Sequence, residues 1–312
     1  MEHILIIKHG ALGDFVMDIG AIFFIREQHP GAKFTLMTSA PFVSLGKQLG
    51  FIDDFIIDNR KTFRTPGILK QVLQGGFTHV YDLQCRPRTL SYRTWLRLLW
   101  PVGTYEWYMS KGLHDNRPTK DTTMHYTIRK THRLGLGTMA VSPWGVELPV
   151  SDISFLHGKG EHFDLLPERF VLFIPGCSAR NAYKRWPSGH FVEIARRLAT
   201  QGIKTVVIGT KAEEEEISAI SQSDPANIIN MMGLTGLMDI PQIALRALCT
   251  VGNDTGPSHM ASLSGAPAIG LYDKRTGHAR LLGPRSTSIV SDSTIDLITP
   301  DRVWEALQPH IS

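Results

Sequence analysis

Short, fully apolar segments that alternate with helix-like patterns are the feature that most constrains this chain. Two clear examples are Ile4–Ile7 and Phe170–Ile174. A strand that is apolar at every position is typical of a sheet covered on both faces. Alternation of such strands with helices predicts βαβ units and a parallel sheet. We therefore predict an α/β fold.

The alternation occurs twice, and 312 residues are more than most single cores hold. In the first series we expect strands at 4–7, 34–37, 55–57 and 77–83 and helices at 15–25, 42–49 and 68–73. In the second we expect strands at 170–174, 205–208, 228–230, 250–251 and 267–272 and helices at 191–198, 214–220, 240–248, 258–263 and 301–307.

A segment rich in Pro, Gly, Ser and Asp, residues 141–160, separates the two series and is the expected linker. We therefore predict two domains, 1–150 and 151–312. The terminal helix is an element that can pack back on the N-terminal domain.

The composition indicates a globular protein of a reducing compartment. Hydrophobic residues make up 42% and charged residues 20% of the chain, as in soluble proteins. The net charge of +4 suits a phosphate-bearing ligand or an anionic surface and requires neither. Cys85, Cys177 and Cys249 have no metal-ligand spacing and suggest no disulfide framework.

No segment suggests export or membrane insertion. The run Met1–Lys8 lacks a basic leader and a cleavage site, so it is interpreted as a strand. No stretch reaches the ~18–20 apolar residues that a membrane span needs. A cytoplasmic location is expected.

The stretch Asn253–His259 predicts an anion site. It follows an apolar strand and begins a helical pattern in which Pro257 suits the first turn. The free N–H groups of that turn and the helix dipole attract anions, and Gly256 allows backbone to approach a ligand. Asp254 adds a polar group at the same turn. A phosphate-containing ligand and a capped surface helix are both compatible with this stretch alone.

The turn Lys8–Asp14 follows the first strand. In parallel sheets ligands bind beyond the carboxyl ends of the strands, so this turn is a second candidate. Its Gly10-Ala11-Leu12-Gly13 does not match G-x-G-x-x-G, and no G-x-x-x-x-G-K-[ST] occurs in the chain. These absences disfavour a nicotinamide dehydrogenase or a P-loop enzyme.

Residues 86–133 differ in composition from the rest. Arginines and lysines are interleaved with aromatics such as Trp95, Trp100 and Trp107, and residues 125–136 are expected to form a helix with a basic face. Such a segment suits an anionic saccharide or a membrane surface. The alternative is a solvated helix whose arginine stems cover apolar surface. No recognition motif accompanies the charge, so nucleic acid is not an expected partner.

Four stretches in order resemble glycosyltransferase family 9, whose best-known members are the lipopolysaccharide heptosyltransferases. They are Gly10–Asp14, Lys184-Arg185-Trp186-Pro187, Gly209 with Glu213, and Asn253–Gly256 with His259. The resemblance covers roughly residues 3–285. It implies a GT-B architecture, with an acceptor-side N-terminal domain and a nucleotide-sugar-binding C-terminal domain, both Rossmann-like, facing each other across a cleft.

The resemblance also implies residue roles. Asp14 is the implied catalytic base, and Lys8, His9, Gly10 and Gly13 form the turn near the acceptor. The implied donor-binding residues are Lys184, Glu213, Asp254, Thr255, Gly256 and His259.

Each role has a simpler alternative. Asp14 can be the N-cap of the first helix. Lys184 can be a surface cation beside Arg180 and Arg185, and His259 can be an ordinary helix histidine. Glu213 belongs to a run of four glutamates, so Glu214 is the alternative ribose contact.

The function implied is inverting transfer of a sugar, with heptose expected, from an ADP-linked donor to a lipopolysaccharide-type or other saccharide acceptor. No cofactor and no metal are expected, and contact with the inner membrane surface is compatible with such an acceptor. Two alternatives share the fold: a nucleotide-sugar epimerase or hydrolase, and a non-catalytic nucleotide-sugar-binding module.

Overall fold

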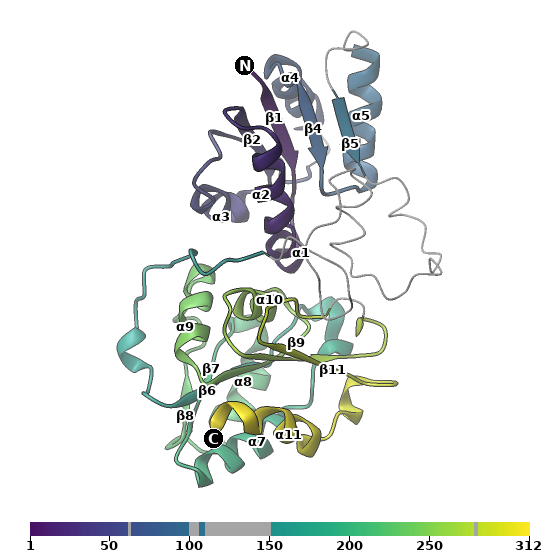
Figure 1. The fold of residues 1–312 in the computed structure, drawn as a ribbon. Helices are drawn as coiled ribbons and strands as arrows, with labels where there is room; N and C mark the ends of the chain where they lie inside the picture. Colours follow the sequence, from purple (N-terminus) through teal and green to yellow (C-terminus); the bar gives the residue numbers. More distant parts are fainter. Residues whose placement is uncertain (62–63, 100–105, 110–150, 278–279) are drawn as a thin grey trace. The chain divides into compact units, whose positions relative to one another are not determined.

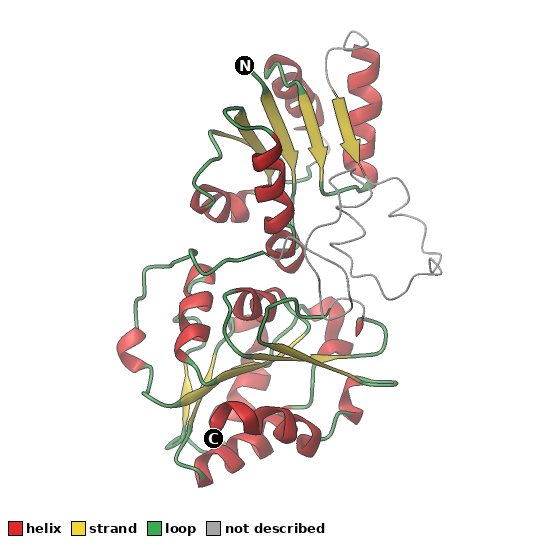
Figure 2. Cartoon of the chain, in the orientation of Figure 1, coloured by secondary structure: helices red, strands yellow, loops and turns green. Residues whose placement is uncertain are grey.

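The computed structural model describes residues 1–312 except 62–63, 100–105, 110–150 and 278–279 (Figure 1). The chain forms two compact units, Met1–Pro149 and Val150–Ser312. In each, a sheet whose strands pair in parallel is accompanied by helices (Figure 2). The α/β prediction with two parallel sheets is confirmed. A helix also expected at 125–136 and the first part of the linker lie outside the described residues.

The first unit contains a sheet in the order β3-β2-β1-β4-β5. Its strands are β1 (His3–Ile7), β2 (Lys33–Thr38), β3 (Asp54–Ile57), β4 (His79–Asp82) and β5 (Glu106–Met109). Its α-helices are α1 (Leu12–Met17), α2 (Ile19–Gln28), α3 (Val43–Gln48), α4 (Thr65–Gln74) and α5 (Pro87–Leu99). The chain runs outward from β1 to β3 and then returns to β4 on the other side of β1. The strand order therefore reverses between β1 and β4, which makes this the switch point where ligands bind in such sheets.

Three features of the first unit differ from the prediction. The helix expected at 15–25 is divided into α1 and α2 at Asp18, which is buried and pairs with Lys8. Both α5 and β5 lie in the basic aromatic segment and were not assigned from the sequence. Residues of α5 such as Tyr92 and Leu96 are buried, whereas Trp95 is exposed, so this part of the segment is a helix with one face packed on the domain.

The second unit contains a six-stranded sheet in the order β11-β10-β9-β6-β7-β8. Its strands are β6 (Phe170–Ile174), β7 (Lys204–Val207), β8 (Ile228–Asn230), β9 (Cys249–Asn253), β10 (Ala268–Tyr272) and β11 (Ser286–Val290). Its α-helices are α7 (Ser188–Thr200), α8 (Glu214–Ser221), α9 (Ile240–Arg246), α10 (Gly256–Leu263) and α11 (Pro300–Ile311). Here the strand order reverses between β6 and β9, where Ile174 lies opposite Gly252. The anion motif after β9 is therefore at a switch point.

Strand β11 was not predicted. Its sequence, Ser-Thr-Ser-Ile-Val, is mostly polar, and only Ile289 is buried. An edge strand of this kind lacks the continuous apolar run by which the inner strands were recognised.

The sequence analysis allowed the terminal helix α11 to pack on the N-terminal domain. In the structure, its apolar face is instead buried in the core of the second unit. Val303, Leu307 and Ile311 recur every four residues and belong to the same cluster as Phe191 of α7. Helical spacing places all three on one face, and that face covers the second sheet.

No described helix has the length and apolar character needed to cross a bilayer.

Replacing Leu307 by Ala should lower the free energy of unfolding by about 2–5 kcal/mol, because it leaves a cavity in a packed core. Urea denaturation followed by circular dichroism measures this change. The control is Leu297→Ala, since that side chain is 63% exposed and its loss should change the free energy by no more than about 0.5 kcal/mol. Equal losses in the two variants would contradict the assignment of α11 to this core.

Candidate functional site

The anion motif of the second unit is built as the sequence predicted. Asn253 ends β9, Thr255 is the N-cap of α10, and Pro257 lies in the first turn. No side chain caps this turn, so its N–H groups keep their capacity to bind an anion. Residues 258–263 are buried, which rules out the alternative of a capped surface helix.

Asn253 ties the motif to the rest of the switch point. Its buried amide donates through Nδ2 to the carbonyl of Pro175, 2.5 Å away, at the end of β6. Its Oδ1 accepts from the backbone N–H of Trp186 at 3.1 Å. Trp186 is itself buried and donates through Nε1 to the carbonyl of Ile298 at 2.7 Å. One amide thus fixes the ends of two neighbouring strands and the segment just after Lys184.

Lys184, Asp254 and His259 form a cluster beside the first turn of α10. Lys184 Nζ donates to Asp254 Oδ2 at 2.7 Å, and His259 Nε2 lies 3.5 Å from Asp254 Oδ1. Burial raises the pKa of the Asp254 carboxyl, but hydrogen bonds from His259 and Lys184 outweigh it, so the pKa is lowered overall. Asp254 is therefore ionised at neutral pH and holds its two partners in place.

The cluster retains donors for a ligand. The ammonium of Lys184 has three hydrogens, of which Asp254 accepts one, and its side chain is 18% exposed. The Nδ1 atom of His259 is buried and has no hydrogen-bond partner among the described residues. A buried polar atom without a partner is costly, which points to a group supplied from outside.

Glu213 lies close to the same strand ends. It ends the short 3-10 helix η5 (Lys211–Glu213), and its Oε2 accepts from the N–H and hydroxyl of Thr210 at 2.9 and 2.7 Å. A Cβ on Gly176, just after β6, would collide with this side chain. Glu214, in contrast, is exposed in the first turn of α8. The structure therefore places Glu213, and not Glu214, against the loop after β6.

In the first unit, Asp14 is the third residue of α1. The N-cap is Ala11, so the alternative in which Asp14 caps the helix is wrong. The side chain is half-buried, and its carboxylate contacts no donor among the described residues. Gly10 has φ +112 and faces the ring of Phe42, a conformation and a closeness that favour glycine.

Lys8 and His9 lie beneath this turn rather than on its surface. Lys8 Nζ pairs with Asp18 Oδ2 at 2.5 Å, and both side chains are buried. The backbone N–H of His9 donates to Gln84 Oε1 at 3.0 Å, and its ring lies against Asp58. Because both side chains are buried, we no longer expect them to contact an acceptor. They anchor the turn that carries Asp14 instead.

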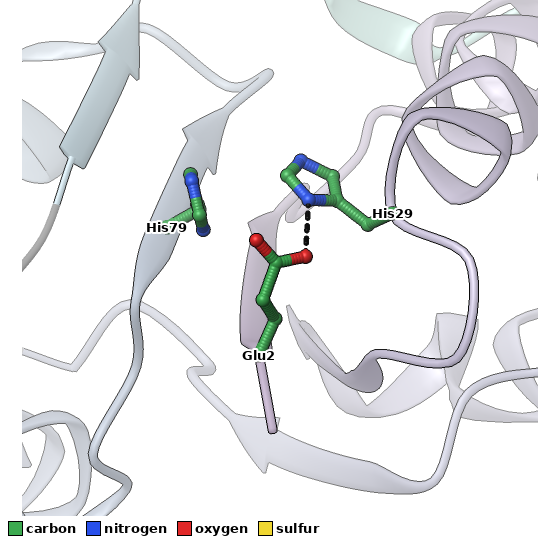
Figure 3. Close-up of side chains that lie close together, drawn as sticks. All are labelled: Glu2, His29 and His79. Carbon is green, nitrogen blue, oxygen red and sulfur yellow. Dashed lines mark hydrogen bonds and ion pairs between the residues drawn. The ribbon is translucent and has the colours of Figure 1, made fainter.

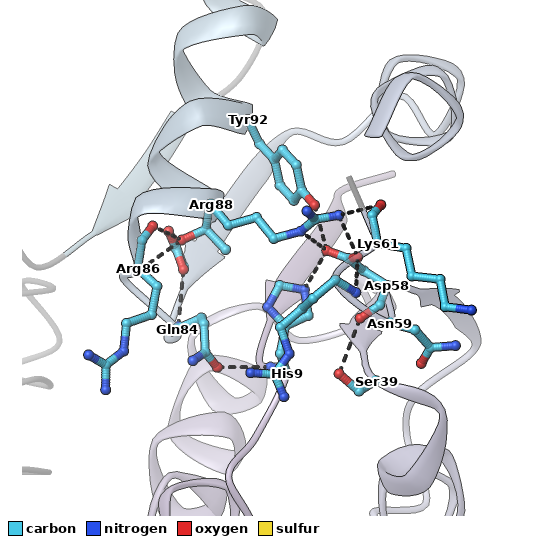
Figure 4. Close-up of polar contacts among 12 residues, drawn as sticks. His9, Ser39, Asp58, Asn59, Lys61, Gln84, Arg86, Arg88 and Tyr92 are labelled. Atoms are coloured by element: carbon cyan, nitrogen blue, oxygen red, sulfur yellow. Dashed lines mark hydrogen bonds and ion pairs between the residues drawn. The ribbon is translucent and has the colours of Figure 1, made fainter. Parts of the chain in front are cut away.

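Asp58, which the sequence analysis did not single out, is the centre of a buried polar network (Figure 4). Arg88 donates to both carboxylate oxygens at 3.0 Å, and the Tyr92 hydroxyl donates to Oδ2 at 2.5 Å. His9 Nε2 lies 3.0 Å from Oδ2, and the Arg60 N–H donates to Oδ1 at 2.8 Å. Burial raises the pKa of this carboxyl, but hydrogen bonds from His9, Arg88 and Tyr92 lower it far below its usual range.

The network joins three segments: the turn after β1, the end of β3 and the first turns of α5. The signal that was available is the pair Arg88 and Tyr92, which lie four residues apart and therefore on one face of a helix. Their partner is 30 and 34 residues away in the sequence, which no local pattern specifies.

Comparison with known proteins adds a family and a fold. The model for glycosyltransferase family 9 (heptosyltransferase) matches residues 125–296, more than half of the chain and a shorter range than the expected 3–285. Lipooligosaccharide heptosyltransferase 2 of Haemophilus influenzae is 33% identical over 113 residues, which are 35% of this chain and 32% of that protein. Lipopolysaccharide heptosyltransferase 2 of Salmonella typhimurium is 28% identical over 173 residues, or 48% and 49% of the two chains. The chain thus matches from about a third to a half of the length of these relatives.

The solved structure of E. coli ADP-heptose lipopolysaccharide heptosyltransferase II has the same fold. The TM-score is 0.72 at 19% identity, over 100% of this chain and 98% of that one. The predicted GT-B architecture, built from two parallel-sheet domains, is confirmed. With the family match over residues 125–296, this shows that the chain belongs to glycosyltransferase family 9.

Proposed function

We propose that this protein is a glycosyltransferase that transfers a sugar from a nucleotide-diphosphate donor to a saccharide acceptor. The observation that carries the proposal is the cluster of Lys184, Asp254 and His259 at the first turn of α10, at a switch point of a Rossmann-type sheet. Family membership supports the same activity.

The donor diphosphate binds at this cluster in our proposal. The ammonium of Lys184 and the first-turn N–H groups of α10 neutralise the charge that builds up on the phosphate oxygens as the nucleotide leaves. Asp254 is the wrong charge for a phosphate contact, so its role is to orient Lys184 and His259. Thr255 and Gly256 supply the start of the helix, and Glu213 reads the ribose from the loop between β7 and α8.

Asp14 is the general base in our proposal. An inverting transfer needs one group to deprotonate the acceptor hydroxyl as it attacks the anomeric carbon. Among the described residues no donor contacts the Asp14 carboxylate, so its oxygens are available to accept the proton of an acceptor hydroxyl. Its place on α1, held by the buried pairs of Lys8 and His9, gives it a fixed position.

ADP-heptose is the proposed donor, and a lipopolysaccharide-type saccharide is the proposed acceptor. The names of the matched heptosyltransferases and of the E. coli structure support these choices. In this proposal Lys184 and the N-terminus of α10 neutralise the diphosphate charge that a divalent cation would otherwise neutralise. No cofactor participates. The protein acts in the cytoplasm, where contact with the inner membrane surface would bring it to a lipid-linked acceptor.

Two other functions make different predictions. An epimerase or hydrolase would release an isomer or a free sugar from the donor without an acceptor. A non-catalytic module would bind the donor and turn over no acceptor. Incubation of the protein with ADP-heptose, with and without a heptose-deficient lipopolysaccharide, separates the three by chromatography of the products.

Lys184→Gln should weaken ADP binding by about 10- to 100-fold, because it removes a charge-assisted hydrogen bond worth roughly 1.5–3 kcal/mol. Isothermal titration with ADP measures the Kd. Lys159→Gln is the control, since its side chain is exposed and pairs only with Glu161 among the described residues. Unchanged ADP affinity in Lys184→Gln would remove Lys184 from the donor site.

Asp14→Asn should reduce kcat by about 10²- to 10⁴-fold, the usual contribution of a general base, and leave the Kd for ADP unchanged. A transfer assay with ADP-heptose and the ADP titration provide the two values. The matched control Asp54→Asn changes an exposed carboxylate of the same unit, paired with Lys33, and should retain wild-type turnover. Near wild-type turnover in Asp14→Asn would mean that another group is the base.

Asp58→Asn tests the network that anchors the turn before Asp14. It should lower the free energy of unfolding by about 3–5 kcal/mol, because Arg88 is left without its charged partner. Since folding lowers the pKa of Asp58, its contribution is complete above the unfolded carboxyl pKa of about 3.9 and is lost as pH falls below it. Urea denaturation between pH 7 and pH 3 should therefore show a smaller acid-induced loss in the variant than in the wild type. Parallel losses would show that Asp58 does not carry this pH dependence.

A further inference from the structure

A second group of polar side chains lies at the amino-terminal ends of β1 and β4, whereas the Asp14 turn follows the carboxyl end of β1. Glu2 precedes β1, His79 begins β4, and His29 follows α2 (Figure 3). The register pairs Ile4 with His79 at this end of the strands, whereas Ile7 pairs with Asp82 at the end that carries the turn. The group is thus separate from the proposed acceptor turn.

The three side chains can each offer one ligand atom, and these atoms all lie within 4.8 Å of one another. His29 Nδ1 is 2.9 Å from Glu2 Oε2, and the rings of His29 and His79 lie with their centroids 4.6 Å apart. Figure 3 shows the Glu2 carboxylate between the two imidazoles. Ligands of a tetrahedral ion with bonds of about 2.0–2.1 Å are roughly 3.4 Å apart. The Glu2 side chain is 49% exposed, so it can move the short remaining distance.

Neighbouring hydrogen bonds prepare both rings for metal binding. Thr78 donates its hydroxyl hydrogen to the carbonyl of His3, so toward His79 Nδ1 at 3.0 Å it can only accept. This contact favours the tautomer of neutral His79 that carries its proton on Nδ1. His29 Nε2 is 2.7 Å from the Tyr81 hydroxyl, whose oxygen can accept a hydrogen bond from the ring N–H when Nδ1 binds an ion. Metal-binding histidines typically have such a partner on the second nitrogen.

We propose that Glu2, His29 and His79 bind a divalent transition-metal ion of the Zn²⁺ class. Two imidazoles and one carboxylate suit Zn²⁺ and its neighbours rather than Mg²⁺ or Ca²⁺, which prefer oxygen ligands. The three residues leave a fourth position for water. The ion joins β1, β4 and the end of α2, so its role is to stabilise the first unit, and it does not depend on the proposed transfer reaction.

The test is titration of the chelator-treated, tag-free full chain with Zn²⁺ by calorimetry, and with Co²⁺ by absorption spectroscopy. The wild type should bind one ion and gain thermal stability, because a ligand that binds the folded state stabilises it. Glu2→Gln and His79→Gln replace ligands without emptying a core, and each should weaken binding by at least about 10- to 100-fold. The control His157→Ala removes an exposed histidine from the second unit and should bind as the wild type does.

Three results would overturn the proposal. The first is the absence of stoichiometric Zn²⁺ binding by the wild type. The second is wild-type affinity in both Glu2→Gln and His79→Gln. The third is an equal loss of affinity in His157→Ala, which would place the bound ion elsewhere. Circular dichroism of each variant checks that it is folded.

Discussion

The buried amide of Asn253 is the interaction on which the proposed donor site depends. It bonds the end of β6 through Pro175 and the loop after η4 (Ala179–Lys184) through Trp186. It therefore links the last residue of β9 to the segment that follows Lys184. The amide thus determines where Lys184 lies relative to the first turn of α10, and the ion pair with Asp254 completes the placement.

In both units, buried ion pairs hold the turn that follows a central strand. In each, a turn follows a central strand at the switch point and is fixed from below by buried, paired charges: Lys8 with Asp18, and Asp58 with Arg88, in the first. In the second, Lys184 pairs with Asp254 and still has hydrogens for a ligand. A buried pair gives little net stability, since desolvation offsets its attraction, but it fixes side chains in one geometry. The carboxylate of Asp14 lacks such a partner among the described residues, as a base requires.

The sequence predicted the inner strands, because a run such as Phe170–Ile174 is apolar at every position and is therefore typical of a strand covered on both faces. It did not predict β11, whose mostly polar sequence lacks the continuous apolar run of the inner strands, or the division of α1 from α2 at Asp18. The order of the motifs along the chain grouped Lys184 with Asp254, and the structure brings these two residues, 70 positions apart, within hydrogen-bond distance. Asp58 could not be found in this way, because its hydrogen bonds with Arg88 and Tyr92 form only when α5 packs near the end of β3.

Hydrogen–deuterium exchange with and without ADP tests the central claim, the position of the donor site, most directly. ADP should slow the exchange of the amides in the first turn of α10, residues 256–259, and in η4, because its phosphates bind those N–H groups or cover them. Amides of β2, which belongs to the first unit and carries no proposed donor contact, should be unaffected. Slowed exchange elsewhere, with residues 256–259 and η4 unchanged, would contradict the account.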